Sequence, residues 1–191
     1  ALGVANHRLE AALGEAIAAG ARSAVIFASC VLEESDRPRL TERLKDMARE
    51  AGLPVCGGNC SGFHNLDAKV RVGLGSTPAM TPGPVALISH SGSVYAAMYA
   101  TGGRLDWNLM VNAGLEFTVS AADYLDFALD MPTTRAVGLF LETVRDPDGF
   151  VAALEKAARR DIPVVIVKVG RSPAGARFAL SHSGAIAGAD A

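Results

Sequence analysis

The second half of the chain alternates short apolar runs with amphipathic helical patterns, and this alternation limits the possible folds more than any other feature. The apolar runs lie at residues 85–88, 108–111, 136–141 and 162–167. Helical patterns follow the first three runs, at about residues 91–100, after Ser120 and after Pro147. Such alternation is typical of parallel strands joined by right-handed crossovers, with ligands at the carboxyl ends of the strands. We therefore expect an α/β fold.

The first part of the chain shows the same alternation. A first helix is predicted from apolar residues at every fourth position: Leu9, Leu13 and Ile17. It precedes an apolar run at 23–28. A second helix, with Asp36 as N-cap and Pro38 in its first turn, is expected before the run 53–56.

Residues 57–83 show no periodic pattern and are rich in Gly, Pro, Ser, Thr and Asn. This composition predicts a long connecting segment with one short strand near residues 69–72. A connecting segment of this length is uncommon inside one compact domain, so we place a domain boundary within it. The expected units are residues 1–76 and residues 77–191, each built on a Rossmann-like or flavodoxin-like parallel sheet.

Composition narrows the classes of partner. The 191 residues carry a formal net charge of −2, which argues against a nucleic-acid partner. No apolar run approaches the roughly 20 residues that span a bilayer, and no signal-peptide pattern opens the sequence. Three cysteines without the spacing of a disulfide framework favour a reducing compartment. We expect a cytoplasmic protein that binds neither membrane nor nucleic acid.

Polar segments follow the predicted strands of the second unit and should therefore meet at one edge of its sheet. These segments are residues 89–93, 112–116, 142–143 and 168–182. The first reads Ser-His-Ser-Gly-Ser and stands between a strand and a helix. Amides at a helix start, the positive end of the helix dipole and serine hydroxyls can together hold a phosphate. Ser91, Gly92 and Ser93 are thus predicted to bind phosphate.

His182 stands in a second stretch of small residues, Ser-His-Ser-Gly-Ala-Ile-Ala-Gly at 181–188. Small neighbours permit close approach by a charged group, and an imidazole can act as a nucleophile at neutral pH. Glu142 directly follows the apolar run 136–141 and could accept the distal N–H of an imidazole, which fixes its tautomer. A surface histidine and a solvent-exposed glutamate are the structural alternatives. A nucleophile and a phosphate site together suggest phosphoryl transfer.

Four motifs along the chain, at residues 57–62, 89–93, 142 and 170–188, resemble those of the NDP-forming acyl-CoA synthetases and follow the same order. This superfamily includes the alpha subunit of succinyl-CoA synthetase and ADP-forming acetyl-CoA synthetase. Residues 57–62, Gly-Gly-Asn-Cys-Ser-Gly, are similar to the family's Gly-Pro-Asn-Cys-x-Gly turn near the CoA site. The resemblance implies that Asn59 and Cys60 bind CoA, although Gly58 stands where proline is usual. Residues 89–93 resemble the start of the family's phosphate-binding helix.

The other two motifs concern the catalytic histidine. Glu142 matches the glutamate that orients it in the family. Residues 170–172, Gly-Arg-Ser, followed by 181–188 look like the histidine loop. The resemblance therefore implies that His182 is transiently phosphorylated.

The implied function is activation of a carboxylic acid with CoA and ATP through an acyl phosphate and a phosphohistidine. Residues 1–76 would be the C-terminal part of a CoA-binding Rossmann-like domain, because the family's Gly-rich first turn has no counterpart before Ala1. Residues 77–191 would be the succinyl-CoA-ligase-like flavodoxin-fold domain. The chain is expected to belong to an acid–CoA ligase. ATP or ADP with Mg²⁺ would bind mainly to an ATP-grasp domain or subunit, and without that part the chain is expected to be inactive. An oligomer is expected.

Three other interpretations fit parts of the sequence. A Ser-His-Asp hydrolase is disfavoured because residues 89–93 lack the Gly-x-Ser-x-Gly elbow. A metal site at Cys56, Cys60 and His64 is disfavoured because glycines interrupt any helix there and three ligands are one short of a structural zinc site. We assign no metal ligand. A non-catalytic CoA-binding or regulatory module of the same architecture is the main alternative.

Overall fold

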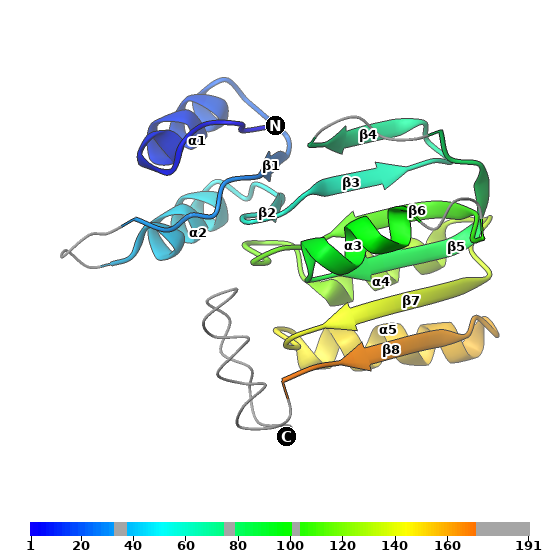
Figure 1. Cartoon of the computed structure of the whole chain (residues 1–191). Coiled ribbons are helices and arrows are strands. Elements are labelled where there is room, and N and C mark those ends of the chain that lie inside the picture. Colours follow the sequence, from blue (N-terminus) through cyan, green and yellow to red (C-terminus); the bar gives the residue numbers. More distant parts are fainter. Residues whose placement is uncertain (33–37, 75–78, 101–103, 171–191) are drawn as a thin grey trace.

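The computed structural model describes residues 1–32, 38–74, 79–100 and 104–170, whose strands form two sheets (Figure 1). In the larger sheet the strands lie in the order β4 (Val70–Gly73), β3 (Gly62–Asn65), β6 (Trp107–Asn112), β5 (Pro82–Ser89), β7 (Ala136–Leu141) and β8 (Val164–Lys168). β5 pairs in parallel with β6 and β7, and β7 pairs in parallel with β8. These strands confirm the predicted α/β fold.

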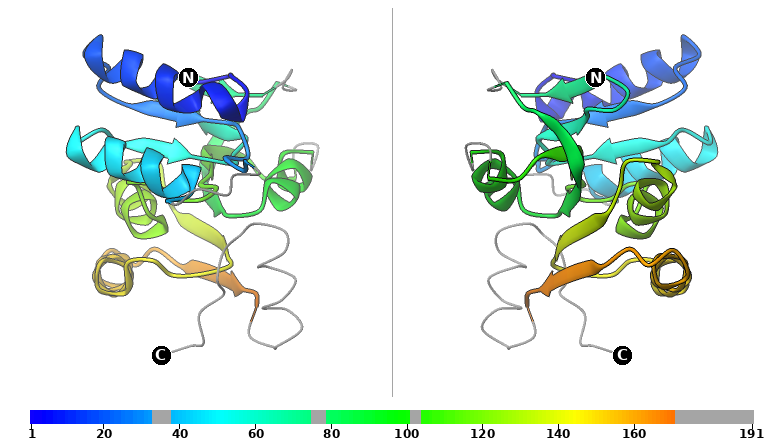
Figure 2. Two further views of the ribbon diagram at one scale, coloured as in Figure 1. Left: turned by 90° about the vertical axis from the view of Figure 1, so that its left-hand side faces the viewer. Right: turned by 90° about the vertical axis from the view of Figure 1, so that its right-hand side faces the viewer.

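Helices cover both faces of the larger sheet (Figure 2). α3 (Gly92–Tyr99) lies on one face, and α4 (Ala121–Asp130) and α5 (Pro147–Arg159) lie on the other. Each begins after an N-cap side chain that accepts a first-turn amide: Ser91, Ser120 and Asp146. The helices therefore start where the sequence predicts, because these capping side chains satisfy otherwise unpaired amides. None of the described helices is long and apolar enough to cross a membrane.

The segment that we expected to be mainly connecting contains an antiparallel hairpin. β3 pairs with β4 and also with β6. The strand expected near residues 69–72 is therefore confirmed as β4, whereas β3 was not predicted. The hairpin has no clear apolar pattern because only Gly62 and His64 of β3 are buried. Gly62 has a φ of +92°, and a Cβ there would overlap the carbonyl oxygen of Val72. β3 and β4 both precede residue 77 but pair within the larger sheet. The predicted domain boundary at residue 76 stays a prediction.

The smaller sheet pairs β1 (Ala24–Ile26) in parallel with β2 (Val55–Gly57). A short 3-10 helix, η1 (Asn6–Arg8), leads into α1 (Leu9–Ala18), and α2 (Leu40–Glu50) joins the two strands. These helices bury one face of the sheet in a cluster that includes Leu9, Leu13, Ile26, Leu44, Val55 and Phe117. The alternate strand residues Val25 and Cys56 belong instead to the core of the larger sheet. The two sheets are thus packed together through these alternate side chains.

Helix α2 begins later than predicted. Its N-cap is Arg39, whose amide donates to the carboxylate of Glu42 at 2.9 Å. Pro38 therefore precedes the helix and does not occupy its first turn. Asp36, the predicted N-cap, lies outside the described residues.

Candidate functional site

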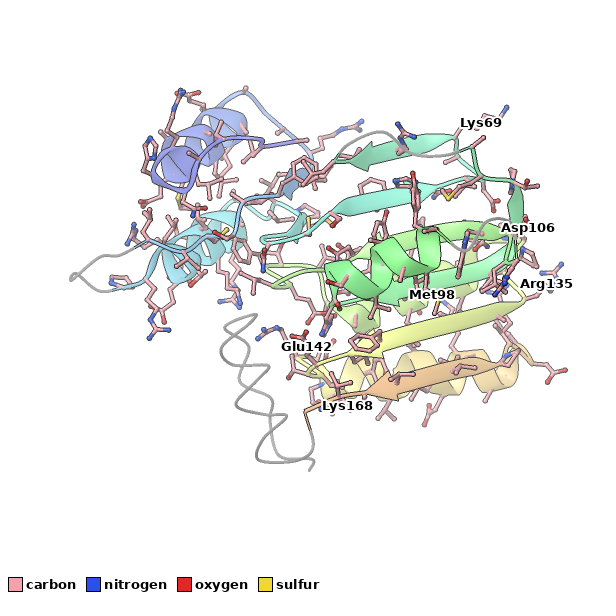
Figure 3. All side chains as sticks on the ribbon, viewed as in Figure 1. Lys69, Met98, Asp106, Arg135, Glu142 and Lys168 are labelled. Atoms are coloured by element: carbon pink, nitrogen blue, oxygen red, sulfur yellow. The ribbon has the colours of Figure 1, made fainter. Side chains whose placement is uncertain are left out.

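The carboxyl ends of the parallel strands meet at one edge of the larger sheet, where Figure 3 shows Glu142 and Lys168. Leu141 is the register partner of Lys168, and the amide of Val169 donates to the Leu141 carbonyl at 2.9 Å. The chain therefore leaves β8 directly beside Glu142. The prediction that the segments after these strands share an edge is confirmed for the described residues.

The turn between β5 and α3 is ordered by its own serines. Ser89 Oγ donates to the Ser91 carbonyl at 2.8 Å and accepts the Ser91 amide at 3.2 Å. Ser91 Oγ then accepts the Val94 amide at 3.3 Å. Amides of a first helical turn have no intrahelical acceptor, and within the described residues those of Gly92 and Ser93 donate no hydrogen bond. These two amides and the positive end of α3 form a suitable place for an anion.

Asn112 connects this turn to the 57–62 turn. Its side chain is buried at the end of β6. Its Oδ1 accepts the Ser61 amide at 2.6 Å, and its Nδ2 donates to the carbonyls of Ser89 at 2.9 Å and His90 at 3.3 Å. One amide side chain therefore holds the predicted CoA turn and the predicted phosphate turn next to each other.

Within the 57–62 turn, Asn59 is exposed and has a left-handed φ of 51°. Cys60 is buried and its thiol donates to the Ile26 carbonyl at 3.3 Å, so any contact of Cys60 with CoA would have to use its backbone. A Cβ on Gly58 would lie 2.5 Å from Cys30 Sγ, which leaves no room for a side chain there. Burial raises the pKa of the Cys30 thiol to about 11. In the described ranges no three His, Cys, Asp or Glu side chains are grouped to hold a metal ion.

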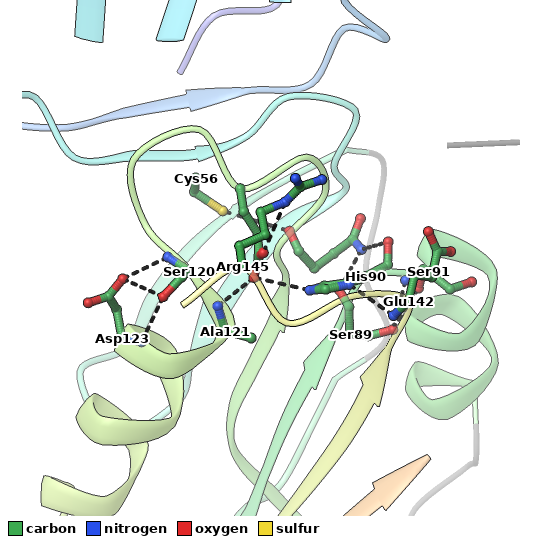
Figure 4. Close-up of polar contacts among 11 residues, drawn as sticks. Cys56, Ser89, His90, Ser91, Ser120, Ala121, Asp123, Glu142 and Arg145 are labelled. Carbon is green, nitrogen blue, oxygen red and sulfur yellow. Dashed lines mark hydrogen bonds and ion pairs between the residues drawn. The ribbon is translucent and has the colours of Figure 1, made fainter. Parts of the chain in front are cut away.

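His90, in the middle of the 89–93 turn, connects two glutamates (Figure 4). Its Nε2 lies 3.0 Å from Glu116 Oε1, and its Nδ1 accepts the Glu142 amide at 3.1 Å. Glu116 Oε1 also accepts the amide of Ala121, the first residue of α4, and Glu116 Oε2 lies 3.3 Å from Arg145 Nε. The side chains of His90 and Glu116 are only 4% and 1% exposed. The site thus contains a buried polar network directly under Glu142.

Lys45 of α2 lies near this network. Lys45 lies with its Nζ 5.6 Å from the ring centroid of Phe117. Burial, and then the positive charges of Arg145 and Arg49, lower the pKa of Lys45. The carboxylates of Glu116 and Glu42 are the nearby negative charges that oppose this effect.

The structure brings together most of the residues predicted from the sequence. Ser91, Gly92 and Ser93 lie at the same sheet edge as Glu142, and Asn59 and Cys60 lie in the adjoining turn. His182 lies outside the described residues.

Sequence reasoning missed the side-chain roles of four residues: His90, Asn112, Glu116 and Arg145. Asn112 and Glu116 belong to a segment expected at this edge, and that position was the only signal available for them. The segments that contain His90 and Glu116 were expected at the same edge, but no local pattern indicated that these two side chains pair, because 26 residues separate them in the sequence.

Comparison with known proteins identifies the family of the chain. Residues 82–191 match the family described as the succinyl-CoA ligase like flavodoxin domain. The acetate–CoA ligase [ADP-forming] I subunit alpha of Pyrococcus furiosus is 32% identical over 160 residues, which are 80% of this chain and 33% of that protein. The 4-hydroxybutyrate–CoA ligase [ADP-forming] of Nitrosopumilus maritimus is 32% identical over 155 residues, 78% of this chain and 22% of that protein. The chain thus spans a third or less of these relatives.

A solved structure shows the same fold over nearly the whole chain. It is the dinucleotide forming acetyl-coenzyme A synthetase 1 of Candidatus Korarchaeum cryptofilum in complex with phosphate and ADP. The TM-score is 0.82 at 27% identity, and the match covers 98% of this chain and 41% of that one. The chain therefore belongs to the NDP-forming acyl-CoA synthetases, through their succinyl-CoA ligase-like flavodoxin domain.

Proposed function

We propose that this chain is the part of an ADP-forming acyl-CoA synthetase that carries the phosphohistidine, with His182 as the phosphorylated residue and Glu142 as its orienting carboxylate. The observation that carries this proposal is the arrangement at the sheet edge. Two amides at the start of α3 and the end of β7 at Glu142 lie together there, beside the end of β8, and β8 precedes His182 in the sequence.

The reaction requires a group that accepts a phosphoryl group and returns it. A carboxylic acid is activated as an acyl phosphate, the thiol of CoA displaces phosphate to form the thioester, and an imidazole nitrogen carries the phosphoryl group to or from the nucleotide. A P–N bond is labile, so transfer can run in both directions. His182 supplies the nitrogen in this proposal.

The described residues would assist this chemistry in two ways. The Glu142 carboxylate would accept the distal N–H of the imidazole, which presents the other nitrogen as the nucleophile. The amides of Gly92 and Ser93 and the hydroxyl groups of Ser91 and Ser93 would stabilise the tetrahedral anion, and one donor of this type is typically worth about 3 kcal/mol.

The remaining substrates would meet the site from two sides. CoA would contact the 57–62 turn through the exposed Asn59 and the backbone of Cys60. ATP or ADP with Mg²⁺ would be held mainly by an ATP-grasp domain or subunit. The chain alone is therefore expected to be inactive.

Phosphoryl labelling of the complete synthetase tests the proposal. Enzyme containing this chain and its ATP-grasp part is incubated with ATP labelled at the γ-phosphate, and acid-labile label on the protein is counted. His182→Ala should remove the label, and Glu142→Gln should slow its appearance at least tenfold while the thermal unfolding temperature is kept. Unchanged labelling of His182→Ala would contradict the proposal and favour a non-catalytic CoA-binding module.

A further inference from the structure

We infer that His90 is a positioning residue that fixes Glu142 for phosphoryl transfer, with Glu116 holding its ring in one tautomer; this inference rests on the function proposed above. His90 is placed in a hydrogen-bonded chain that runs from the start of α4 through Glu116 to the Glu142 amide.

The tautomer of His90 follows from its two partners. A backbone amide can only donate, so the Nδ1 that receives the Glu142 amide at 3.1 Å carries no proton. A carboxylate accepts, so the Nε2 that lies 3.0 Å from Glu116 Oε1 carries the proton and donates it. The arrangement therefore requires a neutral ring protonated at Nε2. A charged ring would place an N–H against the N–H of Glu142.

Glu116 is itself held firmly. Its Oε1 accepts the amide of Ala121 at the N-terminus of α4, where the helix dipole favours negative charge. Arg145 lies against the other oxygen of Glu116, and the Glu116 side chain is only 1% exposed. A carboxylate that accepts one imidazole N–H fixes the ring tautomer and leaves the opposite ring nitrogen as an acceptor. Glu116 thus keeps Nδ1 of His90 as the acceptor for the Glu142 amide.

The ring of His90 takes the place of a backbone acceptor. The His90 amide donates to the Phe140 carbonyl at 2.9 Å and continues the ladder between β5 and β7. In a regular parallel ladder the Glu142 amide would next donate to the His90 carbonyl. Here that carbonyl accepts Asn112 Nδ2 at 3.3 Å, and the Glu142 amide turns to the ring. The direction in which the chain leaves β7 at Glu142 is therefore set by a side chain and does not follow the sheet.

Two substitutions of His90 distinguish its contact with Glu116 from its contact with the Glu142 amide. In His90→Asn the Oδ1 stands as many bonds from Cα as Nδ1 and can still accept the Glu142 amide. In His90→Gln the Nε2 stands as many bonds from Cα as the ring Nε2 and can still donate to Glu116. The Gln Oε1 stands one bond farther from Cα than Nδ1, so the acceptor for the Glu142 amide is displaced from the position that the ring gives it. A purely structural role predicts similar losses for both variants, whereas a positioning role predicts that His90→Asn is the more active.

The test measures the rate of phosphoryl labelling in the complete synthetase, together with kcat and the KM values for CoA and the acid. His90→Gln should lower the labelling rate and kcat about tenfold, the typical effect of one lost hydrogen bond, with KM values within about twofold of wild type. His90→Asn should retain most of the rate. Nitrogen-15 NMR of the wild-type ring should show Nε2 protonated and Nδ1 unprotonated.

The outcomes distinguish this inference from the proposed function. If His182→Ala abolishes labelling while His90→Gln labels at the wild-type rate, the positioning role is overturned and the proposed function stands. If labelling persists in His182→Ala, the proposed function fails and the role of His90 fails with it. A ring protonated at Nδ1 would also overturn the inference.

Discussion

The Nε2 of His90 lies 3.0 Å from Oε1 of Glu116, and almost none of either side chain is exposed. Buried polar groups are costly unless they are paired, so each residue of this pair depends on the other for its place in the core. The same carboxylate accepts the first amide of α4. The pair therefore joins the end of β5, the end of β6 and the start of α4 at the sheet edge.

Glu116→Ala should destabilise the fold by about 3 kcal/mol, because it leaves the His90 N–H and the Ala121 amide without an acceptor in the core. Glu116→Gln should cost less, since its amide oxygen can still accept both. Urea unfolding at pH 7 measures both variants. Glu155, which forms an exposed ion pair with Arg159, offers a matched control. Glu155→Ala should change the free energy of unfolding by less than about 0.5 kcal/mol. Equal stabilities of Glu116→Ala and wild type would contradict the network.

Gly58→Ala should destabilise the protein by about 1–3 kcal/mol, because its new Cβ would lie 2.5 Å from Cys30 Sγ and 3.3 Å from the Phe117 ring. Cys30→Ala removes this sulfur and makes room for the Cβ at position 58. The double variant Gly58→Ala/Cys30→Ala should therefore cost less than the sum of the two single changes, as measured by a double-mutant cycle of unfolding free energies. Simple additivity would show that the turn shifts away from Cys30.

Acid should destabilise the fold through His64, which packs edge-on against Tyr95 and Tyr99. Burial, and to a lesser degree Arg71, lower the pKa of His64 from 6.5 to about 4. As pH falls, His64 is therefore protonated in the unfolded chain before it is protonated in the folded protein. The contribution of neutral His64 to the free energy of unfolding is complete above pH 6.5 and is lost toward pH 4. The expected loss is up to about 3 kcal/mol.

Urea unfolding of wild type and His64→Gln at several pH values between 7 and 4 measures this contribution. The free energy of unfolding should fall less steeply with acid in His64→Gln than in wild type. Parallel curves would mean that His64 does not titrate differently in the folded and unfolded chains.

Cys60→Ala should leave the affinity of the complete synthetase for CoA within about twofold, because the thiol donates inward to the Ile26 carbonyl. Asn59→Ala removes an exposed side chain from the same turn and should weaken CoA binding more. Calorimetric titration of CoA into both variants compares them. A tenfold loss in Cys60→Ala, with its thermal unfolding temperature unchanged, would place the thiol itself in the CoA site.

Much of this site follows from local patterns. The capping residues Ser120 and Asp146 mark the starts of their helices because a side-chain oxygen must satisfy the first amides. The apolar run at 136–141 predicts β7, and the position of Glu142 directly after it predicts a place at the ligand-binding edge. The same reasoning places Ser91 at the start of α3.

The sequence by itself thus determined the alternation of strands and helices outside residues 57–83, the starts of α3, α4 and α5, and the edge of the sheet at which polar residues gather, because each depends on chemistry within a few residues. Only the tertiary structure decided that β3 and β4 extend the larger sheet and that His90 is held between Glu116 and Glu142. Strand order and register set these contacts. A histidine in a turn has the same local sequence whether its ring faces water or a buried carboxylate, so its role becomes visible only when residues 26 and 52 positions away are brought beside it.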